Sequence, residues 1–90
     1  MNKIPNVFDP FVKVINDQFH NFLTNPTYKD IYQELIYDFQ NEPDVHLSLI
    51  YTNDKGMFCC IFKGDSDEIM EEYLNWEDLE TFILDYLTKF

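Results

Sequence analysis

The segment from Asp65 to Asp85 constrains the fold most, because it combines a dense run of carboxylates with regularly spaced apolar residues. It holds nine acidic residues, and no lysine or arginine interrupts them. A solvated acidic tail would lack apolar side chains, so this segment is expected to fold and to present its charge on a fixed surface. Its apolar residues are Ile69, Met70, Tyr73, Leu74, Trp76, Leu79, Phe82, Ile83 and Leu84.

The chain as a whole is acidic and rich in aromatic side chains. Its 90 residues include 17 acids against 6 lysines and no arginine, which gives a formal net charge of -11. Hydrophobic residues make up 46% and aromatic residues 18%, so a folded chain is expected, with one compact acidic domain over residues 1–90. Because this charge repels phosphates and anionic membranes, neither nucleic acid nor a membrane is an expected partner, and a basic protein is.

The ends and the cysteines of the chain indicate a cytoplasmic protein. The N-terminus lacks the pattern of a secretory signal, and no apolar run reaches membrane-spanning length. Cys59 and Cys60 are adjacent, and neighbouring side chains on a strand point to opposite faces, so they are poorly placed to bridge each other. The lack of alanine and arginine is typical of AT-rich coding sequences, such as those of many phages, so the compartment could be a host cytoplasm.

Helical periodicity predicts two helices in the N-terminal half. The first is expected to begin at Asp9-Pro10, with Asp9 as the N-cap, and to end at Thr24-Asn25-Pro26. The second is expected from about Thr27 to Asn41-Glu42-Pro43. Its predicted buried stripe consists of Tyr28, Ile31, Tyr32, Leu35, Ile36 and Phe39.

The second half is expected to contain a β-hairpin followed by helix. Residues 45–52 alternate in polarity, Gly56 suits the turn, and residues 57–62 are apolar on both faces, so this strand is expected to be covered on both sides. Residues 68–74 fit either a helix or a short third strand, and Asn75 is expected to cap a terminal helix. The predicted fold is therefore α+β, with two N-terminal helices, a hairpin with or without a third strand, and one or two C-terminal helices.

Several carboxylates remain once helix caps and turns are accounted for. On the predicted second helix four of them fall four residues apart, and each adjacent like-charged pair would destabilise that helix by about 0.2–0.5 kcal/mol. Their spacing of about 6 Å compares with roughly 3.4 Å for phosphates along a DNA strand. If the last segment is one continuous helix, a second row repeats every seven residues. The first row is Asp30, Glu34, Asp38 and Glu42, and the second is Glu71, Asp78 and Asp85.

We therefore predict a partner-binding surface made of these two rows together with Glu72 and Glu80. Trp76 and Leu84 are candidate anchors, since Trp is enriched at interface hot spots. Two alternatives stay open. The acidic rows could be solvated faces that serve solubility, and Trp76 could pack under the terminal helix in line with Leu79 and Phe82.

No residue pattern points to catalysis, a cofactor or a metal. The two histidines, His20 and His46, have no local partner at metal-ligand spacing, and cysteines in an apolar strand are expected to be unreactive. Asp65-Ser66-Asp67 begins like a calcium loop, but Met70 replaces its glycine and Trp76 its bidentate glutamate. An enzyme is not expected.

In size, acidity and absence of catalytic motifs, the chain is similar to small acidic inhibitors that occupy the nucleic-acid site of another protein. Phage anti-CRISPR and anti-restriction proteins and nuclease immunity proteins have this character. The sequence thus predicts an inhibitor that acts as a DNA mimic, with helix-borne carboxylates that pair with Lys and Arg of a basic nuclease or other nucleic-acid-binding protein. The alternative is a non-inhibitory protein-protein interaction module, such as a homodimer that pairs hairpin edges, with its acidity serving solubility.

Overall fold

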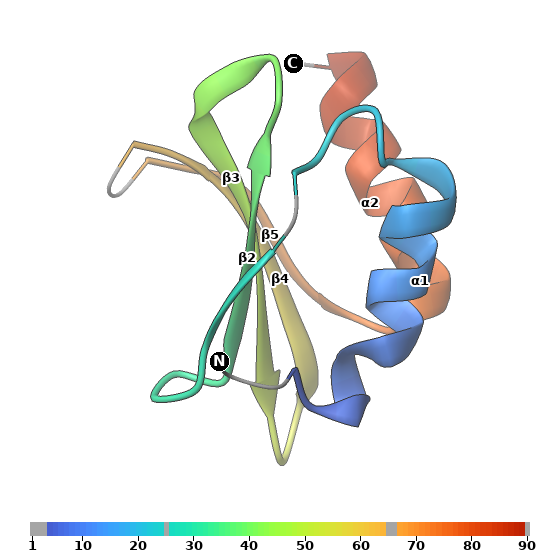
Figure 1. The fold of residues 1–90 in the computed structure, drawn as a ribbon, viewed down its shortest axis with the longest axis vertical. Coiled ribbons are helices and arrows are strands. Elements are labelled where there is room, and N and C mark those ends of the chain that lie inside the picture. The colour runs from blue at the N-terminus through green and yellow to red at the C-terminus, as the bar shows by residue number, and fades with distance from the viewer. Residues whose placement is uncertain (1–3, 25, 65–66, 90) are drawn as a thin grey trace.

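In the computed structural model, which describes residues 4–24, 26–64 and 67–89, two helices lie on one face of a five-stranded antiparallel sheet (Figure 1). A short 3-10 helix, η1 (Asn6–Phe8), leads into α1 (Asp9–Gln18), and α2 (Trp76–Lys89) follows the sheet. The strands are β1 (Thr27–Lys29), β2 (Glu34–Phe39), β3 (Glu42–Thr52), β4 (Gly56–Lys63) and β5 (Asp67–Leu74).

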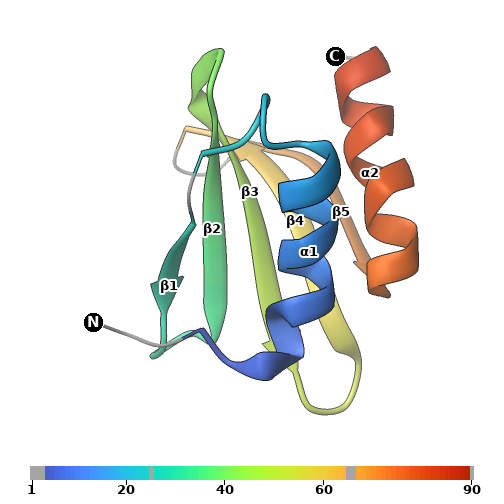
Figure 2. The same ribbon diagram turned by 45° about the vertical axis from the view of Figure 1, so that its right-hand side comes forward.

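The strands follow one another across the sheet in sequence order, so each pairs with its neighbour in the chain. The two long central strands, β3 and β4, are joined by a tight turn in which Gly56 has a φ of 86°, a conformation that glycine adopts without steric cost. Figure 2 shows β1 and β5 at the two edges. Both sides of the β3–β4 hairpin are thus occupied by β2 and β5, and its edges are not free to pair with a second copy.

The core lies between the helices and the face of the sheet that they cover. Strand residues with side chains on this face are buried, among them Leu35, Leu47, Cys59 and Ile61. The helices contribute Phe11 and Ile15 from α1 and Leu79, Phe82, Ile83 and Tyr86 from α2. Burial of this apolar surface is what holds the two helices on the sheet.

The predicted second N-terminal helix is wrong, and with it the predicted fold of two N-terminal helices plus a hairpin. Residues 27–39 form β1, a turn and β2. Ile31 and Tyr32, which were expected in a buried stripe, are 86% and 64% exposed, whereas Tyr37, outside that stripe, is 1% exposed. The turn between β1 and β2 includes Gln33, whose φ is 51°.

The physical reason for this error is that residues 34–39 support two periodicities. Leu35, Tyr37 and Phe39 alternate with polar or half-buried residues, as in a strand, while the same segment also has apolar residues at helical spacing. A hairpin alone is only marginally stable, and β2 supplies the pairing that β3 needs along its free side. Tertiary pairing therefore decides in favour of the strand.

The other expected elements are found with changed boundaries. The first helix begins at Asp9 itself, so Asp9 is not its N-cap, and it ends at Gln18, well before the predicted end at Thr24-Asn25-Pro26. Residues 67–74 form a strand, β5, and the terminal helix after Asn75 is confirmed as α2. Expectations placed on Asn25, Asp65 and Ser66 fall outside the described residues. Within the described part of the chain, no helix has the length and apolarity to cross a membrane.

Candidate functional site

The first predicted acidic row does not exist as a row, because its four residues are not on a helix. Asp30 lies in the turn before β2, Glu34 and Asp38 lie on β2, and Glu42 begins β3. Two residues four apart on a strand are separated by about 13 Å, roughly twice the spacing expected on a helix. Glu42 instead accepts a hydrogen bond of 2.8 Å from the hydroxyl of Tyr86 on α2.

The second predicted row is also divided, because Glu71 belongs to β5 and Asp78 and Asp85 belong to α2. Asp78 and Asp85 do lie together, and with Glu72 of β5 they line a hollow of about 270 Å³ between strand and helix. We call the eight described carboxylates of this strand–helix unit the acidic edge. They are Asp67, Glu68, Glu71, Glu72, Glu77, Asp78, Glu80 and Asp85.

No cation forms an ion pair with the acidic edge among the described residues, although Lys63 of β4 lies opposite Asp67 and Lys55 lies over the ring of Tyr73. Among the described residues the ion pairs are Lys13–Asp17, at 2.8 Å, and, when the imidazole is protonated, His46–Asp38, at 2.6 Å, and neither involves the acidic edge. Seven of its eight carboxylate residues are exposed and Asp85 is half-buried. Its charge is therefore available to a partner.

The two candidate anchors are both partly exposed. Trp76, 47% exposed, lies at the start of α2 and lines a hollow of about 530 Å³ with residues of α1, including Pro10 and Val14. Leu84, 42% exposed, lies on the outer side of α2. About half of the Trp76 surface is covered, so both interpretations of this residue, as an anchor and as part of the packing beside Leu79 and Phe82, fit its exposure.

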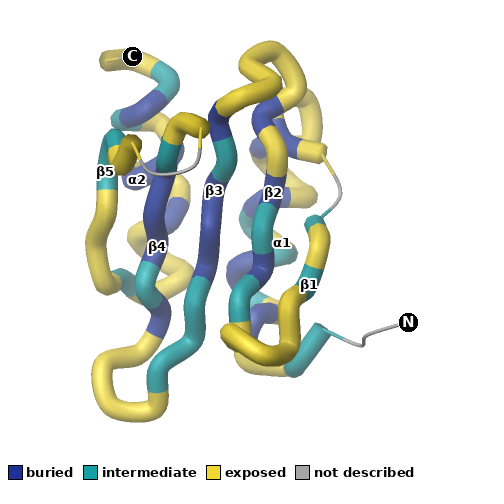
Figure 3. Tube along the Cα trace, turned by 90° about the vertical axis from the view of Figure 1, so that its left-hand side faces the viewer, coloured by how far each residue is buried: buried dark blue, intermediate teal, exposed yellow. Residues whose placement is uncertain are grey.

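The face of the sheet opposite the helices is not covered by any other described element, contrary to the expectation that β4 is covered on both sides. Figure 3 looks onto this open face, where β3 and β4 run through the middle and the exposed strand β5 forms one side. Strand pairing arranges its side chains in three rows that cross the sheet about 6.8 Å apart. The rows are Glu34–Ile50–Phe58–Tyr73, Ile36–Ser48–Cys60–Glu71 and Asp38–His46–Phe62–Glu68.

A groove crosses the open face because its middle row has small side chains at its centre. Ser48 and Cys60 form the floor and are only 2% and 8% exposed, since the larger residues of the flanking rows stand on both sides of them. We call this hollow of about 360 Å³ the open-face groove. It is lined by Glu34, Ser48, Ile50, Phe58, Cys60, Phe62 and Glu68.

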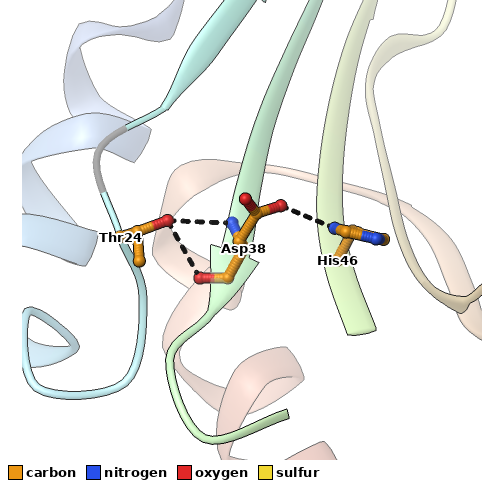
Figure 4. A network of polar contacts seen from close by, with 3 residues as sticks. All are labelled: Thr24, Asp38 and His46. Atoms are coloured by element: carbon orange, nitrogen blue, oxygen red, sulfur yellow. Dashed lines mark hydrogen bonds and ion pairs between the residues drawn. The ribbon is translucent and has the colours of Figure 1, made fainter. Parts of the chain in front are cut away.

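Hydrogen bonds hold the carboxylates around this groove in place. The hydroxyl of Ser48 donates to a carboxylate oxygen of Glu34 across a distance of 2.6 Å. Close by, the backbone of Asp38 makes two bonds of 3.3 Å with the Thr24 hydroxyl, and its carboxylate lies 2.6 Å from Nδ1 of His46 (Figure 4). The carboxylate of Asp38 therefore points toward His46, and Asp38 is not part of the helical row that was predicted.

An irregularity in β5 brings Glu68 and Glu71 onto the same face. Phe62 pairs with Glu68 and Ile61 with Met70, so Ile69 is an extra residue and the alternation shifts by one. The two carboxyl groups consequently meet, and their hydrogen bond, with the nearby charge of Glu68, raises the pKa of Glu71 above its ordinary value. Sequence alternation alone would have placed them on opposite faces.

The best potential metal ligands among the described residues are Cys60, Glu68 and Glu71, whose ligand atoms lie within 4.8 Å of one another. Burial raises the pKa of the Cys60 thiol to about 11, and the charges of Glu68 and Glu71 add to the effect. A metal requires the thiolate, and structural zinc sites use four ligands rather than three. Three ligand atoms, two of them on exposed carboxylates, do not by themselves identify a metal centre, and the high pKa makes the Cys60 thiol a weak nucleophile.

Comparison of the chain with models of known protein families, with curated proteins and with solved structures gave no match. Inference about function thus rests on the two surfaces described above. The sequence pointed to the acidic edge through its run of carboxylates. It gave one signal for the groove, namely that β4 has apolar residues on both faces. This pattern was interpreted as a strand covered by other elements on both sides.

Proposed function

We propose that this protein binds a basic protein through its acidic edge and thereby inhibits that partner's binding to nucleic acid. The observation that carries the proposal is that eight carboxylates on β5 and α2 are held by regular secondary structure without an ion-paired cation among the described residues. Lysine and arginine side chains that hold phosphates in a nucleic-acid-binding protein would pair with such carboxylates equally well.

Electrostatics supports binding over a solely solubilising role. A surface that serves only solubility normally mixes charges of both signs, whereas residues 67–85 contain no lysine or arginine. A net charge of -11 would also accelerate encounter with a cationic partner, and this acceleration falls as salt screens the charges.

The runner-up function, a homodimer, is less well supported. β5 is one of the two strands at the sheet edges, and four carboxylates, those of Asp67, Glu68, Glu71 and Glu72, lie on it. Pairing two copies along β5 would bring like charges together, which is a common means of preventing edge association. β1, at the other edge, has only three residues.

The proposal describes a binding protein rather than an enzyme. The cysteines, the strongest potential nucleophiles, are buried in β4, and desolvation raises the pKa of Cys59 to about 12. A thiol with so high a pKa is almost entirely protonated near neutral pH and is a weak nucleophile.

The test is to capture partners from a lysate of the native host and to measure how the protein changes their nucleic-acid binding. A variant with Glu72→Gln, Asp78→Asn and Glu80→Gln should bind a captured partner about tenfold or more weakly, equivalent to ~1.4 kcal/mol or more. The matched control, Asp30→Asn, Asp44→Asn and Asp54→Asn, removes the same charge elsewhere and should retain most of the affinity. Rising salt should weaken the wild-type complex.

Two results would contradict the proposal. One is that both triple variants bind equally, since the location of the charge would then not matter. The other is that captured partners bind nucleic acid as tightly with this protein as without it. Both variants should fold, because each replaces exposed carboxylates and reduces like-charge repulsion, and loss of the Asp78 charge from the first turn of α2 costs only about 0.3–1 kcal/mol.

A further inference from the structure

We infer that the open-face groove receives an arginine side chain of the basic partner, an inference that rests on the proposed function and names the contact that orients the complex. The helices cover only one face of the sheet, so the apolar side chains of β4 on the other face remain partly exposed. Ile50, Phe58 and Phe62 are half-buried around a floor of two small residues. A surface of this kind gains free energy when a partner covers it.

The aromatic walls suit a planar cation. Phe58 and Phe62 stand on either side of Cys60, four residues apart on β4, so their Cα atoms are about 13 Å apart and a guanidinium between them can stack on either ring. Each ring is braced from the side, Phe58 by Tyr73 with ring centroids 4.9 Å apart and Phe62 by His46 at 5.1 Å. A guanidinium is planar, weakly hydrated and stacks on aromatic faces, whereas an ammonium is compact and strongly hydrated.

The same face already holds one cation against an aromatic ring. The ammonium of Lys55 lies 5.5 Å from the ring centroid of Tyr73, which is the next ring along from Phe58. This contact is a cation–π interaction within the protein. An arginine in the groove would form the same kind of cation–π contact with Phe58, whose ring lies next to that of Tyr73.

Carboxylates at both ends of the groove complete the match to arginine. Glu34 is fixed by the hydroxyl of Ser48 through one oxygen, and a carboxylate has about four lone-pair sites, so it can still accept hydrogen bonds. Glu68 lies at the other end, beside Glu71. Paired N–H groups of a guanidinium can bind a carboxylate through two parallel hydrogen bonds, which a lysine cannot do.

Charge excludes a second copy of this chain as the occupant. The open face carries Glu34, Asp38, Glu68 and Glu71, and two such faces would bring these carboxylates together. Lys29 lies opposite Glu34 in the pairing of β1 and β2 but is in neither of the ion pairs of the described residues. With Lys29 and Lys55 counted against the four carboxylates, the net charge of the face is still negative, which favours a positive partner.

The test uses a blocked Gly-Arg-Gly peptide and its citrulline analogue, which keeps the shape and removes the charge. We expect amide NMR signals of β3 and β4 around Ser48 and Cys60 to shift saturably with the arginine peptide and to remain unchanged with citrulline. Cys60→Leu fills the floor while it keeps every carboxylate, and Glu34→Gln with Glu68→Gln removes the charge while it keeps the shape. Each should weaken binding of the arginine peptide about tenfold or more.

The control is the acidic-edge variant Glu72→Gln, Asp78→Asn and Glu80→Gln, which should bind the peptide in the groove like the wild type. Two results would overturn the groove assignment and leave the proposed function standing. One is that the NMR shifts are confined to residues 72–85. The other is that the Cys60→Leu variant and the Glu34→Gln, Glu68→Gln variant both bind the arginine peptide as tightly as the wild type. Concentration-dependent self-association through this face would also overturn it. Conversely, peptide binding in the groove together with captured partners that do not bind nucleic acid would refute the proposed function alone.

Discussion

Replacing Cys59 by valine should change how the stability of this protein responds to alkaline pH. Cys59 is 0% exposed on the helix-facing side of β4. Desolvation, with smaller contributions from the charges of Cys60 and Glu72, raises the pKa of its thiol from an ordinary 9.0 to about 12. The folded protein therefore keeps this proton at pH values where the unfolded chain has released it.

The magnitude follows from proton linkage. Below about pH 9 the thiol is protonated in both states, so the stabilisation from this proton is fully present. As the pH rises above 9, the unfolded state is favoured by about 1.4 kcal/mol per pH unit, until the folded thiol also ionises near 12. At about pH 10.5 the free energy of unfolding of the wild type should thus be about 2 kcal/mol lower, through the Cys59 thiol alone, than it is below about pH 9.

The assay is urea unfolding followed by far-UV circular dichroism at about pH 8 and about pH 10.5, with a reductant present. Cys59→Val should differ from the wild type by less than about 1.5 kcal/mol at the lower pH, because the two side chains are similar in size. The other ionisable groups are common to both proteins and cancel in the comparison. If the stability difference between the proteins stayed constant between the two pH values, the argument that burial holds the thiol protonated would be refuted.

Three further substitutions test the core and the open face. Tyr37→Phe removes a buried hydroxyl that has no hydrogen-bond partner among the described residues, so the free energy of unfolding in urea should rise by about 1 kcal/mol, and a decrease would show that the hydroxyl is satisfied. Leu47→Ala, at a site 0% exposed, should lower the stability measured by calorimetry by about 2–5 kcal/mol, and a loss well below this would mean that the core closes over the cavity. Glu68→Gln should lower the pKa of Glu71 toward its ordinary value in a carboxyl NMR titration, because the neutral amide removes the neighbouring charge and can donate to the Glu71 carboxylate; an unchanged titration would contradict the contact.

Local patterns in the sequence determined the elements whose signals agree with one another. The expected cap at Asn75 and the apolar residues after it predicted α2, whose first turn holds Glu77 and Asp78 and whose last turn holds Lys89, as the helix dipole favours. The β3–β4 hairpin followed from the alternation of residues 45–52, the apolar run of residues 57–62 and a glycine in the turn. In these segments propensity, periodicity and turn chemistry all favour one structure.

Residues 27–41 show where local patterns are not enough. Their apolar residues fit a helix as well as a strand, and the predicted charge row on Asp30, Glu34, Asp38 and Glu42 depended entirely on the helix. Tyr37 did not belong to the helical stripe, yet it is among the largest fully buried side chains of the core. Pairing with β3, across the turn at Gln40 and Asn41, selects the strand, and the periodicity of residues 27–41 does not contain this partner.

By itself, the sequence determined the excess of carboxylates, the run of them between residues 67 and 85, and the two-sided apolar character of β4, because these are properties of composition and of neighbours along the chain. The tertiary structure decided which of these groups share a surface. The shift of register at Ile69 brings Glu68 and Glu71 together, and the pairing of β3 with β4 sets Ser48 beside Cys60 to form the groove. Strand register depends on hydrogen bonds between strands and on the extra residue at Ile69, and the alternation within a single strand specifies neither.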